Sequence, residues 1–304
     1  MPARLLFGNI NKLDPSSLKP VLQHAGIQEL DTAARYGNGE SERIVGRAQL
    51  ANDFKIDTKI LIGDSGGDGS LTPEAIEQSL SNSLVSLGVE KVNVLYCHGP
   101  DTVTPIAVQA KAFDEEYRKG RFSYLGVSNF PPSMVSDWLA LSQQEGYIKP
   151  SVYQGQYNLL CRGYEETLFP LLRKHDMVFN AYGPLAGGFL LGNFTPAGLQ
   201  TGNRFVAGSP WVSWYDKPSM HEAVERLRSI AAEAGLGMDE LALRWIVFHS
   251  ILRESDGVIL GATKIEQLES NLRQIEKGPL DEGLVGRLNG LWEGVKHEAD
   301  KSFS

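Results

Sequence analysis

The chain has 304 residues, of which 42% are hydrophobic, and a formal net charge of −8 at pH 7. This composition indicates a globular protein with a large core, and the acidic balance argues against nucleic acid or an anionic membrane surface as the main partner. Cys97 and Cys161 form no CxxC pair, so neither a disulfide framework nor a metal site is indicated. No signal peptide or membrane-length apolar segment is present, so we expect a cytoplasmic protein.

Short apolar runs rich in β-branched residues alternate with longer amphipathic segments along the chain. The helix predicted from Pro73 shows the pattern well, because Thr72 can cap it and Gly88 can end it. The runs predicted to be strands are Leu5–Phe7, Gln28–Asp31, Lys55–Lys59, Val92–His98, Phe122–Ser128, Val152–Gln156, Met177–Tyr182 and Gly257–Gly261.

Strands that alternate with helices of this length predict crossover connections and a parallel sheet. About eight such units favour an α/β fold: a single (β/α)8 TIM barrel over residues 1–304, with elaborated loops at the C-terminal face. A doubly wound open sheet is the rival fold, and it normally carries a GxGxxG turn after an early strand. The nearest string, GNGESE at residues 37–42, lacks the last glycine.

Four polar side chains stand at the ends of three successive predicted strands. Asp31 ends the first of these strands and Tyr36 follows in its loop, while Lys59 and His98 end the next two. Taken singly, each has a structural explanation, such as a helix cap, a solvated lysine, a half-buried aromatic or a rim histidine. In a barrel, however, all four would meet at the C-terminal face, where active sites lie.

These residue types together suit proton delivery to a carbonyl oxygen. A phenol with a pKa of about 10 is a poor proton donor near pH 7 unless its anion is stabilised. A lysine ammonium beside the phenol does this, and a carboxylate keeps the ammonium charged despite burial. A histidine can donate a hydrogen bond to the carbonyl, and the hydride must come from a cofactor.

The four residues resemble the catalytic tetrad of the aldo-keto reductase superfamily. LDTAARYGNGESE resembles its DTAxxYGxxE signature, and the likeness continues through LGVSNF, YQGQYN, AYGPLAGGFLLGNF and VILGATKIEQLESNL, being greatest for the aflatoxin-aldehyde reductase branch. The resemblance implies reversible, NADPH-dependent reduction of an aldehyde or ketone to an alcohol. Tyr36 would be the general acid, Lys59 and Asp31 would tune it, and His98 would orient the carbonyl.

The resemblance also implies a binding site for NADPH or NADP+. Residues matching those that hold the nicotinamide are Ser128, Asn129, Gln154 and Tyr182. Residues matching the pyrophosphate strap are Gly183, Pro184, Leu185, Ala186, Gly187, Gly188 and Asn193. Residues matching the adenosine end are Arg204, Thr263, Lys264, Gln267, Glu269, Ser270 and Asn271. Lys264 and Arg204 would bring positive charge to the extra phosphate of NADP(H), although each could instead be an ordinary surface cation.

The substrate is less well defined by the sequence. The loop GSPWVSWYDK offers Trp211, Trp214 and Tyr215, which either pack the loop onto the barrel or, with His98, face an apolar or aromatic small-molecule carbonyl. Gly183 replaces the family's usual asparagine, and the tail lacks the terminal arginine that branch members use toward acidic substrates. A second hypothesis is an NADP(H)-binding regulatory subunit with vestigial reductase activity, and a homodimer is left open.

Overall fold

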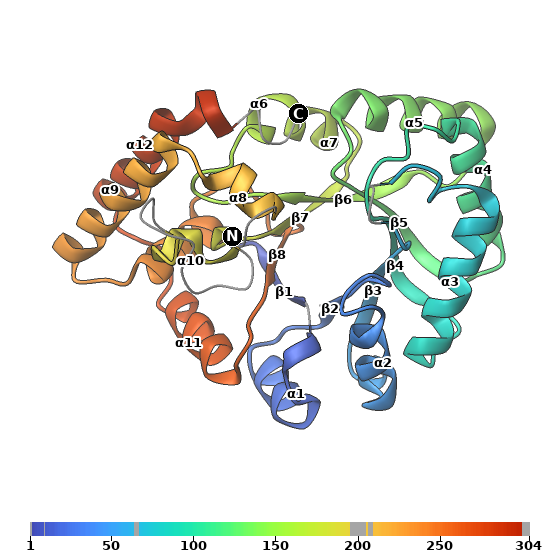
Figure 1. Ribbon diagram of the computed structural model, residues 1–304, viewed down its shortest axis with the longest axis horizontal. Helices are drawn as coiled ribbons and strands as arrows, with labels where there is room; N and C mark the ends of the chain where they lie inside the picture. Colours follow the sequence, from blue (N-terminus) through green and yellow to red (C-terminus); the bar gives the residue numbers. More distant parts are fainter. Residues whose placement is uncertain (1, 9, 64–66, 195–204, 206–208, 300–304) are drawn as a thin grey trace.

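The computed structural model describes residues 2–8, 10–63, 67–194, 205 and 209–299, and its eight parallel strands form a closed barrel. Each strand pairs with the next along the chain, and the last pairs with the first, so that the strands form a ring (Figure 1). The strands are β1 (Arg4–Gly8), β2 (Glu29–Asp31), β3 (Lys55–Lys59), β4 (Val92–Cys97), β5 (Phe122–Ser128), β6 (Pro150–Gln156), β7 (Val178–Tyr182) and β8 (Gly257–Leu260).

Helices surround this ring of strands on its outer side (Figure 1). The α-helices are α1 (Pro15–His24), α2 (Glu40–Arg47), α3 (Pro73–Leu87), α4 (Ile106–Arg118), α5 (Pro132–Glu145), α6 (Tyr164–Thr167), α7 (Phe169–Lys174), α8 (Pro210–Tyr215), α9 (Pro218–Ala234), α10 (Met238–Phe248), α11 (Ile265–Glu276) and α12 (Glu282–Ala299). Short 3-10 helices are η1 (Ile10–Lys12), η2 (Leu50–Asn52) and η3 (Ala186–Leu191). The predicted (β/α)8 barrel is therefore confirmed, while the assignment of residues 1–304 to one domain stays a prediction.

Local sequence signals account for where the elements begin and end. Thr72 Oγ1 accepts a hydrogen bond from Ala75 N at 3.2 Å, which caps α3. Pro73 lies in the first turn of this helix, where a backbone N–H would have no partner within the helix, so that the missing N–H of proline costs nothing. Gly88 ends the same helix in the left-handed conformation, with a φ of 67°. The predicted strands match the observed ones to within one or two residues at each end, and His98 follows β4 directly.

The molecule has one large apolar core between strands and helices and a much smaller apolar cluster inside the barrel. The inner cluster consists of Val94, Tyr96 and Val152, with Val178 packed against it. Polar side chains, including Lys59, occupy much of the remaining interior and are almost completely buried. Buried polar groups are costly unless they find partners, so the barrel interior is organised by hydrogen bonds and charge pairs.

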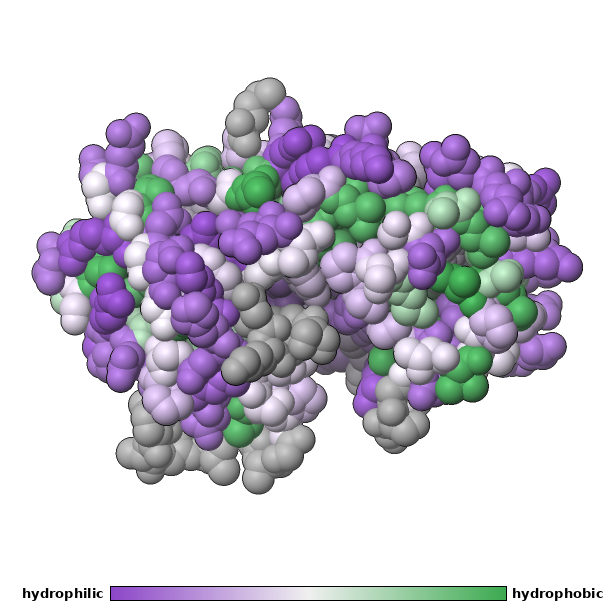
Figure 2. Space-filling view, turned by 90° about the horizontal axis from the view of Figure 1, so that it is seen from above, coloured by the Kyte–Doolittle hydropathy of each residue, from purple (hydrophilic) through white to green (hydrophobic). Residues whose placement is uncertain are grey.

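The outer surface is largely hydrophilic, as the net charge leads one to expect. Figure 2 shows one face of the molecule, on which hydrophilic residues predominate and hydrophobic residues form separate patches. Across the described part of the chain, every helix is too short or too polar to cross a bilayer.

The close packing of α2 on α3 gives a test of the fold. A Cβ atom on Gly46 would lie 2.1 Å from the backbone oxygen of Ser86, whereas one on Gly290 of α12 would meet no atom within 4 Å. We predict that Gly46→Ala lowers the free energy of unfolding by about 1–3 kcal/mol, because α2 must move away from α3. The matched change Gly290→Ala should raise it by about 0.5–1 kcal/mol. Urea unfolding followed by circular dichroism measures both, and equal effects would contradict the packing described.

Candidate active site

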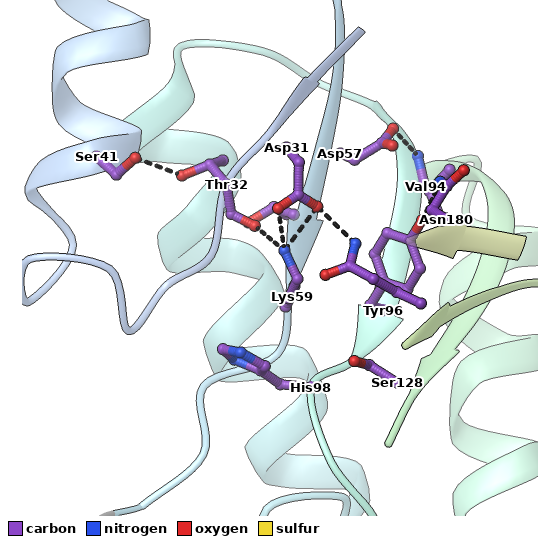
Figure 3. Close-up of polar contacts among 12 residues, drawn as sticks. Asp31, Thr32, Ser41, Asp57, Lys59, Val94, Tyr96, His98, Ser128 and Asn180 are labelled. Carbon is purple, nitrogen blue, oxygen red and sulfur yellow. Dashed lines mark hydrogen bonds and ion pairs between the residues drawn. The ribbon is translucent and has the colours of Figure 1, made fainter. Parts of the chain in front are cut away.

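A buried ion pair lies at the C-terminal ends of β2 and β3. Lys59 Nζ donates to both carboxylate oxygens of Asp31 at 2.7 Å and to the backbone oxygen of Thr32 at 2.8 Å (Figure 3). The side chains of Lys59 and Asp31 are 0% and 3% exposed. All three donor positions of an ammonium are thereby used, which is what a fully buried lysine needs in order to stay charged.

The environment of Lys59 favours the charged form. Burial alone would lower the pKa of Lys59, but the facing Asp31 and then Tyr36 oppose this effect and hold the pKa above its ordinary value. Lys59 is therefore an ammonium at neutral pH. Its positive charge lies 5.0 Å from the centre of the Tyr36 ring.

The loop after β2 places Tyr36 over this ammonium. Tyr36 N bonds to Ala33 O at 3.0 Å, and the chain then turns sharply through three successive residues with positive φ: Gly37 (58°), Asn38 (54°) and Gly39 (81°). Glycine and asparagine adopt this conformation more readily than other residues, so the sequence allows the chain to enter α2 directly. The GNG string is thus a turn that positions the phenol.

His98 lies at the rim, with its ring 5.7 Å from the Tyr36 ring in an edge-on arrangement. Burial, together with the positive charges of Lys59 and Arg35, lowers the pKa of His98 to about 3. The imidazole is therefore neutral at physiological pH and carries one N–H donor. Its Nδ1 is buried and has no hydrogen-bond partner within the described residues.

The structure thus brings Asp31, Tyr36, Lys59 and His98 together, as the sequence predicted. It also adds two neighbours of the ion pair that sequence reasoning had not placed there. Gln154 Nε2 donates to Asp31 Oδ1 at 2.8 Å, and the Tyr96 ring lies 5.6 Å from Lys59 Nζ. The alternation of side chains along β4 puts residue 96 on the same face as residue 98, and this signal could have identified Tyr96.

The residues predicted to hold nicotinamide border the tetrad at the ends of β5, β6 and β7. Asn129 Nδ2 donates to Ser128 Oγ at 3.1 Å and to the backbone oxygen of His98 at 3.3 Å. The Tyr182 hydroxyl donates to Asn129 Oδ1 at 3.0 Å. Burial raises the pKa of Tyr182 well above its usual value, so this phenol stays neutral. Ser128, Asn129 and Tyr182 therefore form one polar group next to His98, whereas the Gln154 side chain binds Asp31.

The strap after β7 has an unusual backbone. Positive φ angles occur at Gly183 (69°), Ala186 (53°), Gly187 (67°) and Gly188 (105°). A Cβ atom on Gly187 would lie 2.7 Å from the Trp211 ring, so only glycine fits beneath that ring. Pro184 and Leu185 belong to the same turn, and Asn193 lies near Gly188, with its Nδ2 3.2 Å from where a Cβ atom would stand.

The residues predicted at the adenosine end gather at the start of α11. Gln267 Oε1 accepts from Thr263 N at 3.1 Å and from Thr263 Oγ1 at 3.0 Å, and Lys264 is exposed directly before the helix. The remaining positions lie one turn further along: Glu269, Ser270 and Asn271. Arg204 lies outside the described residues, so its predicted role is not addressed by the structure.

The predicted loop aromatics pack mainly against one another and the strap. Trp211 stacks with Tyr215 at 6.2 Å between ring centres and meets Trp214 edge-on at 5.2 Å. Tyr215 is completely buried, and its hydroxyl accepts from Asn158 Nδ2 at 3.1 Å. In this arrangement Tyr215 serves to pack the loop, and it presents no surface to a ligand.

A pocket of about 560 Å³ opens beside the mouth of the barrel, and sequence reasoning missed it. Gln156 at the end of β6 lines it, together with residues of the following segment and of α12, among them Trp292 and His297. The Oε1 atom of Gln156 is buried and has no partner in the part of the chain that the structure describes. Within that same part, no group of three or more His, Cys, Asp or Glu side chains could hold a metal ion.

Comparison with known proteins agrees with this geometry. The profile of the Aldo/keto reductase family matches residues 10–293. The chain belongs to the aldo-keto reductase family. It is 36% identical over 295 residues to human aflatoxin B1 aldehyde reductase member 2, covering 91% of this chain and 81% of that protein. It is also 36% identical over 300 residues to Oxidoreductase sirO of Leptosphaeria maculans, covering 97% and 90% of the two chains.

Another relative of this aldo-keto reductase is named as a channel subunit and not as a reductase. A probable voltage-gated potassium channel subunit beta of Arabidopsis thaliana is 30% identical over 291 residues, covering 91% of this chain and 87% of that protein. The resemblance inferred from the sequence is confirmed at the level of the family and of the aflatoxin-aldehyde reductase branch. Membership of the family makes the protein an oxidoreductase that acts on carbonyl groups.

The buried ion pair predicts a strong energetic coupling. Asp31→Asn should lower the free energy of unfolding by about 3–5 kcal/mol, because it leaves the buried Lys59 ammonium without its counter-charge. Lys59→Met should cost a similar amount by stranding the carboxylate. The loss of unfolding free energy in the double variant should be smaller than the sum of the two single losses by about 0.5–3 kcal/mol, measured by urea unfolding at pH 7. Simple additivity would show that the two groups do not interact as described.

Proposed function

We propose that this aldo-keto reductase transfers a hydride from NADPH to an aldehyde or ketone and delivers the proton from Tyr36. The proposal rests on one observation above all. A buried ammonium, fixed by Asp31 and Thr32, lies 5.0 Å from the Tyr36 ring centre, with the neutral His98 imidazole beside it.

Each group then has a defined task. NADPH, when bound, supplies the hydride to the carbonyl carbon. Tyr36 gives its proton to the oxygen as that oxygen becomes an alkoxide, and the Lys59 ammonium stabilises the phenolate that remains. Asp31 keeps Lys59 charged, and the neutral His98 donates a hydrogen bond that orients the carbonyl. In the oxidation of an alcohol, the Tyr36 phenolate takes the proton back.

The cofactor residues are those that the family resemblance implies, and their surroundings support the proposal. Ser128, Asn129 and Gln154 offer amide and hydroxyl groups for the carboxamide of nicotinamide, and Tyr182 offers a ring for stacking. The glycines of the strap, from Gly183 to Gly188, let backbone amides approach a pyrophosphate closely. Lys264 at the N-terminus of α11 would favour the additional phosphate of NADP(H), since a helix N-terminus and a cation both attract anions.

For the substrate, the pocket beside Gln156 suggests where its body would lie. The pocket is large enough for a small molecule, and Trp292 of α12 supplies an aromatic wall. Trp211 and Trp214 are partly buried at the strap and do not line this pocket, so their contact with a substrate stays a prediction. Charged side chains also line this pocket, among them Arg162, Glu165 and Lys296, so an apolar or aromatic carbonyl substrate stays a prediction from the sequence.

The alternative of a cofactor-binding regulatory subunit has one supporting observation, the similarity to the plant protein named as a probable channel subunit. The human protein named aflatoxin B1 aldehyde reductase member 2 is more similar, at 36% identity against 30%. The complete tetrad also favours catalysis. Tight NADPH binding without turnover of any carbonyl compound would support the regulatory subunit instead.

The role of the tetrad can be tested with an activated aromatic aldehyde and NADPH, followed by the loss of NADPH absorbance. Tyr36→Phe should abolish turnover, because the proton donor is removed. Lys59→Met should lower kcat by about 10²–10⁴-fold, because the phenolate loses its stabilising charge. NADPH affinity, measured by fluorescence titration, should change little in either variant. A comparable loss of affinity would show that the variants disturb the cofactor site as a whole rather than remove a catalytic group.

The cofactor preference can be tested at Lys264. We predict that wild-type protein prefers NADPH to NADH and that Lys264→Ala reduces this preference about 10-fold, because one phosphate contact is lost. Lys111→Ala removes an exposed lysine from α4 and serves as the matched control. The comparison uses kcat/KM for both cofactors, and an unchanged ratio in Lys264→Ala would assign the phosphate site to other residues.

A further inference from the structure

A second buried carboxyl lies inside the barrel next to the catalytic ion pair. Asp57 stands two residues before Lys59 on β3, so both side chains point to the inside of the barrel. In the strand register, Asp57 is paired with Asp31 of β2, and Figure 3 shows the two acids next to each other. The tetrad mechanism gives Asp57 no task.

The two carboxylate oxygens of Asp57 differ in their hydrogen bonds. Its Oδ1 accepts from Asn93 Nδ2 at 2.7 Å and from Val94 N at 3.1 Å. Its Oδ2 is buried and has no hydrogen-bond partner among the described residues. A buried carboxylate with one oxygen unsatisfied is costly, whereas a protonated carboxyl at the same place is much less so.

The charged and titratable groups facing Asp57 come from three strands. Glu29 and Asp31 on β2 repel a negative charge there, Lys59 on β3 attracts it, and Tyr96 on β4 faces it as a phenol. Burial first, and then the negative charge of Glu29, raises the pKa of Asp57 to about 8. Asp57 is thus a neutral acid at pH 7 that ionises in the slightly alkaline range.

We propose that Asp57 is a positioning residue for the Tyr36–Lys59 pair, a second buried carboxyl whose charge sets the pH at which Tyr36 loses its proton. This inference rests on the proposed role of Tyr36 as the proton donor. It assigns to the chain an additional group that controls the working range of the reaction.

The direction of the effect follows from the charges. While Asp57 is neutral, the Lys59 ammonium is balanced by Asp31 alone and can stabilise a phenolate on Tyr36. When Asp57 ionises, a second negative charge enters the same interior and opposes a negative charge on Tyr36. Tyr36 then keeps its proton to a higher pH. Carbonyl reduction, which needs the protonated phenol, extends further into the alkaline range.

The direct test is a spectrophotometric titration of Tyr36. The tyrosinate absorbance of each protein is compared with that of its Tyr36→Phe counterpart, in the wild-type and Asp57→Asn backgrounds. We expect Asp57→Asn to move the midpoint of Tyr36 ionisation down by about one pH unit. Asn93→Ala, which removes one hydrogen bond that favours ionised Asp57, should give a smaller shift in the same direction. Asp114→Asn removes a buried carboxylate from α4 outside the barrel and should give none.

Kinetics and stability complete the test. The alkaline limb of kcat/KM for aldehyde reduction should move with the optical midpoint, while urea unfolding shows that each variant is folded. An unshifted midpoint in folded Asp57→Asn, or an upward shift, would overturn the proposal and leave Asp57 a structural residue. Absence of turnover in wild-type protein would instead refute the proposed function, and the optical titration would still decide whether Asp57 controls Tyr36.

Discussion

The central constraint of this structure is the burial of a lysine ammonium. Lys59 has no exposed side-chain surface, so its charge persists only because Asp31 and the Thr32 carbonyl meet all three donor positions. Gln154 in turn binds Asp31, which fixes the carboxylate from a strand on the far part of the ring. The ion pair thereby ties β2, β3 and β6 together at the end of the barrel where the chemistry is expected.

The closed barrel explains how the four residues come together, three of them at the ends of successive strands and Tyr36 in the loop after β2. A closed parallel barrel directs every strand end to the same face, so Asp31, Lys59 and His98 converge although they are far apart in sequence. Tyr36 reaches the site through a turn whose positive φ angles suit the GNG string. Burial first, and then the positive charge of Lys59, lowers the pKa of His98 and keeps that imidazole neutral.

Much of this could be predicted from the sequence, because the relevant signals are local. Strand ends, the Thr72 cap and the Gly88 stop each depend on neighbouring residues, and the barrel follows from the alternation of strands and helices. The meeting of Asp31, Lys59 and His98 was predictable because they sit at such ends, and Tyr36 was predictable because it follows Asp31 in the same loop. Asp57 and the pocket beside Gln156 were not, because their roles depend on contacts between strands and with α12, which a linear pattern does not contain. The sequence left two roles open for Tyr215, packing the loop or facing the substrate, and only the observed packing shows that its side chain is buried.

The most direct test of the account is the charge on Lys59 itself. In protein labelled with ¹⁵N-lysine, the Nζ resonance that disappears in Lys59→Met belongs to this residue, and its chemical shift reports protonation as the pH is raised. The account predicts an ammonium throughout the neutral range, with a pKa above the ordinary value of about 10.4. A neutral amine at pH 7 would contradict it, because an uncharged Lys59 could not stabilise a phenolate on Tyr36.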